Sequence, residues 1–78
     1  EWSRIQPDVD RWDESALDYY REIVRGALEN RLTPMVTLHH FTEPLWVTEL
    51  GGWQNEAVIA HFETYVRRTV TALKEYVR

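Results

Sequence analysis

The fold prediction depends on residues 32–41, which read LTPMVTLHHF. Met35 to Leu38 form a nearly continuous apolar run. Such a run is typical of a strand that is covered on both faces, as in a parallel sheet flanked by helices. We therefore expect a strand over residues 32–41. Pro44 and the pair Gly51-Gly52 mark residues 42–53, which follow the strand, as a loop.

Helices are predicted on both sides of this strand. The first begins at an N-cap, Asp13, and ends at Asn30, because Asn tolerates the left-handed conformation of a helix C-terminus. The second follows an N-cap at Asn55 and runs to the end of the chain. Each helix carries one apolar stripe at three- and four-residue steps, the pattern of a helix with one buried face. The stripes consist of Ala16, Leu17, Tyr20, Ile23, Val24, Ala27 and Leu28, and of Val58, Ile59, Phe62, Tyr65, Val66, Thr69, Val70, Leu73 and Val77.

A further short strand is predicted over residues 1–5, which combine aromatic and β-branched side chains and are followed by Pro7. The order is then strand, helix, strand, helix. The predicted fold class is therefore α/β, with right-handed βαβ units and a parallel sheet. In such folds the ligand-binding residues follow the C-terminal ends of the strands, here residues 6–8 and 39–53. A length of 78 residues allows one domain at most, or a piece of one.

Composition and charge exclude several classes of protein. The chain has no cysteine, which excludes disulfides, thiolate metal ligands and a cysteine nucleophile, and mildly favours an intracellular protein. Nine basic and thirteen acidic residues give a net charge of −4, so no basic stripe is available to bind nucleic acid. No apolar run approaches the roughly 20 residues that span a bilayer, so no membrane segment is expected. Glu1 falls inside a predicted strand and Arg78 inside a predicted helix, and we expect that both ends are cut.

The pair His39-His40 is the most informative local feature. Adjacent residues of a strand point to opposite faces, so one imidazole is expected to face a barrel axis and the other the helical layer or the rim. The alternative is that both are structural and are satisfied by backbone or carboxylate partners. A metal site needs three or four convergent ligands; the two histidines diverge and His61 lies on a separate helix, so no metal site is predicted. No glycine loop that could cradle phosphates and no nucleophile elbow occurs, and no cofactor is expected.

Aromatic and acidic residues accompany the histidines in the predicted loop. Aromatic rings stack on sugar rings, and an indole N–H can bond a hydroxyl. Trp53 is interpreted as mostly structural, whereas Trp46 stays open between packing and sugar binding. Glu43 and Glu49 could act as paired carboxylates on a glycosidic bond, but each is interpreted as an exposed loop charge.

Separate blocks of the sequence together resemble family 1 of the glycoside hydrolases, which includes β-glucosidases and β-galactosidases. The blocks are EWSRIQP at residues 1–7, PMVTLHHF at residues 34–41, PLW at residues 44–46 and GGWQN at residues 51–55. The resemblance implies a TIM (β/α)8 barrel in which residues 1–78 supply the end of strand 2, helix 2, strand 3 and helix 3. This βαβα segment is about a quarter of a barrel, since a complete barrel takes about 250 residues. The remainder of the barrel is therefore required.

The resemblance also implies a function. Family members are retaining β-glycosidases that hydrolyse the O-glycosidic bonds of β-glucosides or related β-glycosides, so the expected partner is a small carbohydrate. They carry an acid/base glutamate in an Asn-Glu-Pro motif and a nucleophile in a Thr-Glu-Asn-Gly motif. Neither motif occurs in this sequence. No catalytic residue is therefore assigned to this segment, and the isolated chain is expected to be inactive. A cytoplasmic location is expected.

Substrate-binding residues are implied by the resemblance alone. His40 matches the family histidine that hydrogen-bonds hydroxyls of the sugar in the −1 subsite, and a neutral imidazole offers one donor and one acceptor for this purpose. Phe41 stands where many members have tryptophan; it keeps an apolar surface for packing or sugar contact but lacks the indole donor. Trp46 is placed toward the rim on the aglycone side. His39 is expected to have a structural or supporting role.

Two alternatives stay open. The first is a non-catalytic sugar-binding or interaction module derived from such a barrel, which would unfold cooperatively on its own. A piece of a barrel would instead be molten or oligomeric, because its strand edges and inner helix faces are uncovered. The second and weaker alternative is a barrel hydrolase of a different family with a similar third strand.

Overall fold

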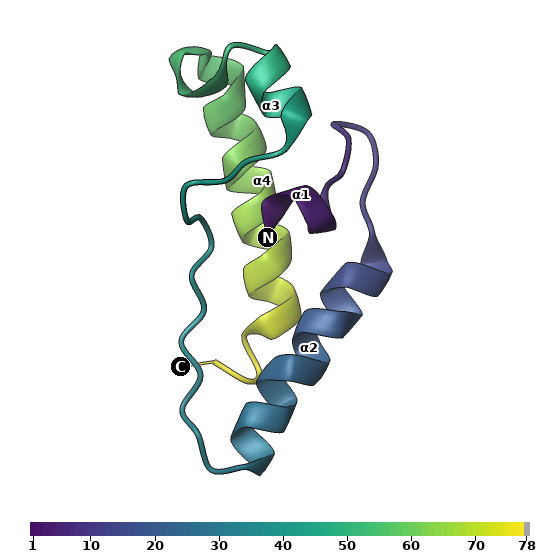
Figure 1. Ribbon diagram of the computed structural model, residues 1–78, viewed down its shortest axis with the longest axis vertical. Coiled ribbons are helices and arrows are strands. Elements are labelled where there is room, and N and C mark those ends of the chain that lie inside the picture. Colours follow the sequence, from purple (N-terminus) through teal and green to yellow (C-terminus); the bar gives the residue numbers. More distant parts are fainter. Residues whose placement is uncertain (78) are drawn as a thin grey trace.

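A computed structural model describes residues 1–77. Two long helices, α2 (Glu14–Glu29) and α4 (Glu56–Leu73), lie side by side (Figure 1). Three shorter elements complete the structure: α1 (Trp2–Ile5), α3 (Leu45–Glu49) and the 3-10 helix η1 (Gly52–Gln54). The chain between α2 and α3 is extended and returns along the length of the molecule (Figure 1).

Both predicted helix N-termini are confirmed. The Asp13 carboxylate accepts a hydrogen bond from the Ala16 amide at 3.2 Å, and the Asn55 side chain accepts one from the Ala57 amide at 3.0 Å. These bonds satisfy amides of the first turn that have no partner inside the helix. The Ser15 hydroxyl and the Ala16 amide, which both bond Asp13, lower the pKa of its carboxyl from the ordinary value.

The C-terminus of α2 differs from the prediction by one residue. Asn30 is the C-cap, as expected, but its φ is −92°, and Arg31 adopts the left-handed conformation with a φ of 62°. The Leu32 amide donates to the Ala27 carbonyl at 2.9 Å and the Arg31 amide to the Leu28 carbonyl at 3.0 Å. This pair of bonds is the Schellman motif, which requires the left-handed residue directly after the cap and so assigns it to Arg31.

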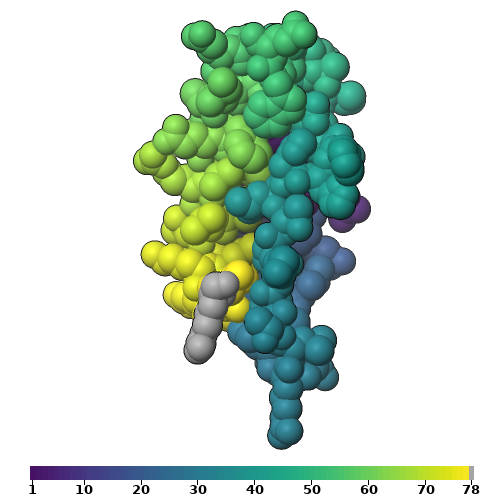
Figure 2. All heavy atoms as spheres, turned by 90° about the vertical axis from the view of Figure 1, so that its left-hand side faces the viewer, coloured from purple at the N-terminus to yellow at the C-terminus, as the bar shows by residue number. Residues whose placement is uncertain are grey.

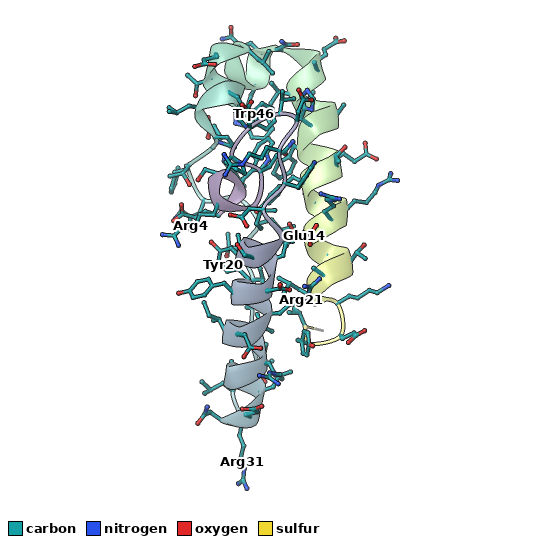
Figure 3. All side chains as sticks on the ribbon, turned by 90° about the vertical axis from the view of Figure 1, so that its right-hand side faces the viewer. Arg4, Glu14, Tyr20, Arg21, Arg31 and Trp46 are labelled. Atoms are coloured by element: carbon teal, nitrogen blue, oxygen red, sulfur yellow. The ribbon has the colours of Figure 1, made fainter. Side chains whose placement is uncertain are left out.

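Replacing Arg31 with glycine is expected to stabilise the full-length protein by about 1 kcal/mol, because glycine adopts a positive φ without the steric cost that a Cβ brings. The Arg31 side chain extends into solvent at the end of α2 (Figure 3) and has no ion pair among residues 1–77, so its loss costs no contact there. The urea midpoint of unfolding measures the gain. The matched control, Arg25→Gly inside α2, is expected to lose about 1 kcal/mol. A lower midpoint for Arg31→Gly would contradict the prediction.

The two predicted strands are not confirmed in the part of the chain that is described. Residues 2–5 form α1. Residues 32–38 are extended and residues 39–41 belong to a turn, and neither part pairs with another segment; the one β-bridge within residues 1–77 joins Asp8 to Arg11. A strand is defined by backbone hydrogen bonds to a neighbour. No such neighbour lies beside residues 32–41 among the 77 residues that the structure describes. The predicted loop 42–53 is also wrong in part, because it contains α3 and η1.

An aromatic core joins α1, α3 and α4. Trp2, which is 1% exposed, stacks on Tyr65 with ring centroids 5.2 Å apart and meets the edge of Trp46 at 5.6 Å. Phe62 and Trp53 also contact Trp2, at 5.4 and 6.1 Å. Burial of large aromatic rings supplies much of the stabilisation in so short a chain.

The apolar stripes of the long helices are only partly covered. Leu17 and Val24 of α2 and Val58 of α4 are buried, as predicted. Ile59 and Val70, predicted on the buried face of α4, are instead 58% and 47% exposed. The predicted core is therefore wrong at these two positions within residues 1–77.

Candidate functional site

The turn at residues 39–43 connects the extended segment to α3. Figure 2 shows the extended segment running along one face beside α4. The Tyr65 hydroxyl of α4 donates a hydrogen bond of 2.6 Å to the Leu38 carbonyl. This bond fixes the end of the extended segment directly before the two histidines.

Burial raises the pKa of Tyr65 to about 12, from an ordinary value of 10.0. The folded protein therefore holds the phenolic proton more tightly than the unfolded chain does. The stabilisation is fully present below pH 10 and is lost as the pH rises from about 10 to 12, because the unfolded chain then releases this proton first.

The difference in unfolding free energy between the full-length protein and its Tyr65→Phe variant tests this linkage. Near pH 8 the variant is expected to be less stable by about 1 kcal/mol, the usual worth of a hydrogen bond. The difference should shrink between pH 10 and 12. Tyr19→Phe, at an exposed position, is the matched control for removal of a phenolic hydroxyl. A difference that stays constant over this range would contradict the prediction.

The two histidines face different surroundings. The His39 ring meets Trp53 edge-on at 5.4 Å and Phe62 at 6.1 Å, so it faces the helical layer. His40 is exposed and its imidazole has no hydrogen-bond partner among residues 1–77. The structure thus separates the two imidazoles, as alternation along an extended chain predicts. The role of His40 in sugar binding stays a prediction.

Phe41 forms the outermost part of the turn. Its side chain is 89% exposed, and its ring lies 4.9 Å from that of His40. A shallow hollow of about 340 Å³ is lined by His39, His40 and Phe41. The backbone of Phe41 has a φ of 65°, a conformation that costs energy for any residue with a Cβ and that occurs often at binding sites.

Trp46 lies inside the molecule, between α3 and α4 (Figure 3). It is 7% exposed, and its indole N–H donates to the Gln6 carbonyl at 2.9 Å. The His61 ring meets the Trp46 ring edge-on at 5.2 Å. The structure therefore does not bring Trp46 together with His40 and Phe41 on the surface, and the donor of its indole is already used.

The acidic residues near the turn have different environments. Glu43 is not the exposed loop charge that was predicted: its side chain is 24% exposed, and its Oε2 lies 3.3 Å from His39 Nε2. Glu49, at the end of α3, is exposed as predicted. Among residues 1–77, no group of three or more His, Asp or Glu side chains could hold a metal ion.

This region is organised by Gln6, which the sequence analysis did not single out, and by Glu43, which it interpreted as an exposed charge. Gln6 is buried; its side-chain oxygen accepts from the Trp2 indole at 2.9 Å, and its amide nitrogen donates to the Val9 carbonyl at 3.2 Å. Glu43 pairs with His39, as described. No local pattern marks Gln6, and the four-residue spacing of His39 and Glu43 gives no signal either, because that spacing brings side chains together only within a helix.

Residues 1–78 match glycosyl hydrolase family 1 over their whole length. The chain belongs to this family, as the resemblance predicted. Family 1 glycosidases are TIM barrels, and the family is one of enzymes.

Curated relatives agree with the family. The chain is 40% identical to the cytosolic beta-glucosidase of Homo sapiens over 68 residues, which are 85% of this chain and 14% of that protein. It is 36% identical to lactase/phlorizin hydrolase of Rattus norvegicus over 66 residues, 82% of this chain and 3% of that protein. It is 37% identical to 6-phospho-beta-galactosidase 1 of Streptococcus pneumoniae (strain ATCC BAA-255 / R6) over 67 residues, 85% of this chain and 14% of that protein. The chain thus spans less than a fifth of the length of these relatives. No helix within residues 1–77 is long and apolar enough to cross a membrane.

Proposed function

We propose that this chain is a segment of a retaining β-glycosidase and that His40 and Phe41 form part of its sugar-binding subsite. The observation that carries the proposal is the exposed imidazole of His40, which has no partner within residues 1–77 and lies beside an exposed aromatic ring. An imidazole can donate to one sugar hydroxyl and accept from another, while an aromatic face packs on the C–H face of the sugar.

The proposal places residues 32–38 as a strand of the barrel in the full-length protein. Their backbone is extended, and the amides of residues 35–37 find no backbone acceptor within residues 1–77. Met35 is 92% exposed, although it belongs to the apolar run that predicted a buried strand. Neighbouring strands and a covering layer in the rest of the protein would satisfy both features.

The shape of the chain also favours part of a barrel over a free-standing module. Its Cα radius of gyration is 13.4 Å. A compact domain of this length is expected to have a radius of about 11.5 Å. The larger value, together with the exposed stripe residues of α4, supports a segment that packs against further structure.

The proposed reaction has two steps. One carboxylic acid protonates the leaving glycosidic oxygen while a second carboxylate attacks the anomeric carbon, and water then releases the sugar with retained configuration. Both carboxylates lie outside this segment in the proposal. His40 contributes binding: hydrogen bonds to sugar hydroxyls orient the ring and tighten in the transition state.

Trp46 has an indirect part in this proposal. Because it is buried and its N–H bonds Gln6, it supports the residues of the aglycone rim by packing. We also propose a cytoplasmic location, which is supported by the similarity to the cytosolic beta-glucosidase of Homo sapiens.

Assays of the full-length protein and of the 78-residue chain test the proposed function. The full-length protein is expected to hydrolyse p-nitrophenyl β-D-glucoside, or the galactoside or 6-phosphate analogues, and proton NMR should show the β-anomer as the first product. The 78-residue chain alone should show no hydrolysis above buffer. Inversion of configuration, or no activity of the full-length protein on any of these substrates, would overturn the proposal. If the 78-residue chain alone unfolds cooperatively and also binds glucose, the result would favour the alternative of a non-catalytic sugar-binding module.

A further inference from the structure

We propose that the contact between His39 and Glu43 is a clamp that positions His40 and Phe41 for sugar binding. The inference rests on the proposed function, since it concerns the same subsite. It makes His39 and Glu43 positioning residues, which act on the sugar through the turn and do not touch it.

Within the described residues, no hydrogen bond other than the His39–Glu43 contact joins the two ends of the turn. His39 Nε2 lies 3.3 Å from Glu43 Oε2, and the two residues belong to no helix, so their contact joins the two ends of the segment 39–43. Their side chains are 29% and 24% exposed. The arginine–carboxylate ion pairs within residues 1–77 are more exposed; Arg67 and Glu63, for example, are 78% and 63% exposed. Water therefore competes less for the hydrogen bond between His39 and Glu43 than for these ion pairs.

The helical layer holds one half of the clamp in place. The His39 ring packs edge-on against Trp53 of η1 and Phe62 of α4, and these two rings contact each other at 5.2 Å. The Tyr65 hydroxyl fixes the carbonyl of the preceding residue, Leu38. The two aromatic rings thus hold the His39 side chain, and the Tyr65 hydrogen bond holds the backbone directly before it. The contact with Glu43 connects this fixed position to the far end of the turn.

The side chains of His40 and Phe41 are not held in place by hydrogen bonds to the helices within residues 1–77. The two side chains contact each other. Phe41 is held at a positive φ, which a residue with a Cβ adopts only when its surroundings impose it. Opening the clamp would let this residue relax to a negative φ and would redirect the His40 imidazole.

A double-mutant cycle in the full-length protein tests the clamp. Glu43→Leu is expected to lower kcat/KM for p-nitrophenyl β-D-glucoside by about tenfold, the size of effect that residues in one hydrogen-bond network show on each other. In the His40→Ala background the same substitution should have no further effect, because the residue that it positions is absent. Glu43→Gln keeps an oxygen that can accept from the imidazole and should stay within about twofold of the wild type. Glu49→Leu, an exposed glutamate outside the turn, is the matched control and should leave kcat/KM unchanged.

Amide hydrogen exchange supplies a second readout that does not depend on activity. Glu43→Leu should speed exchange in the peptide that covers residues 39–43 and leave exchange within α4 unchanged. Equal losses of kcat/KM from Glu43→Leu in both backgrounds, or unchanged exchange in the turn, would overturn the clamp. If His40→Ala alone leaves the kinetics unchanged, the sugar-binding role of His40 fails, and the exchange result then shows separately whether the His39–Glu43 contact orders the turn.

Discussion

Replacing His40 with alanine in the full-length protein is expected to lower kcat/KM for β-glucosides by roughly 5- to 150-fold. The imidazole would make hydrogen bonds to sugar hydroxyls in a site from which water is excluded. Loss of one partner from such a bond costs about 1–3 kcal/mol, which corresponds to this range of rates. Steady-state kinetics with p-nitrophenyl β-D-glucoside measures the effect.

The stability of the His40→Ala variant should not change. Its side chain is exposed and makes no hydrogen bond within residues 1–77, so the thermal midpoint should match that of the wild type. Glu49→Gln, on the exposed end of α3, is the kinetic control and should behave as the wild type. Unchanged kinetics for His40→Ala would show that this imidazole does not bind the sugar.

Replacing Trp2 with alanine is expected to cost about 3–5 kcal/mol of unfolding free energy, the usual cost of removing a large buried aromatic side chain. Trp2 is 1% exposed and contacts four aromatic rings, and its indole N–H donates to Gln6. Its removal leaves a cavity at the junction of α1, α3 and α4 and also leaves the buried Gln6 oxygen without its donor.

Urea unfolding of the full-length protein, followed by circular dichroism, measures the loss for Trp2→Ala. The net stability of a folded protein is only about 5–15 kcal/mol, so the variant should unfold at a much lower urea concentration. Tyr19→Ala is the control, because Tyr19 is 55% exposed and its removal opens no cavity. A loss below 1 kcal/mol for Trp2→Ala would show that the aromatic cluster contributes little to stability.

Helix starts were predictable because they depend on neighbouring residues. The side chains of Asp13 and Asn55 bond amides two or three residues away, so sequence identity at those positions is enough. At the end of α2, the same use of local residue preference was wrong by one position. Residue preference favoured Asn30 for the left-handed position, but the hydrogen bonds of the Schellman motif place Arg31 there.

The candidate site was predictable only in part. The order His39-His40 in an extended segment indicated that the two imidazoles diverge, and the structure has them so. The sequence did not indicate that Trp46 would bury its indole against the Gln6 carbonyl, 40 residues earlier in the chain. Whether an aromatic residue in a loop faces inward depends on distant segments, which residue type alone does not reveal.

The sequence by itself determined the family, the two N-caps and the helical periodicity, because these follow from residue identity and from bonds that span a few positions. Only the tertiary structure decided which side of each stripe is buried, that residues 32–41 lie unpaired beside α4, and that Glu43 meets His39. The physical reason is that burial, strand pairing and side-chain pairing outside a helix depend on how the backbone folds in space.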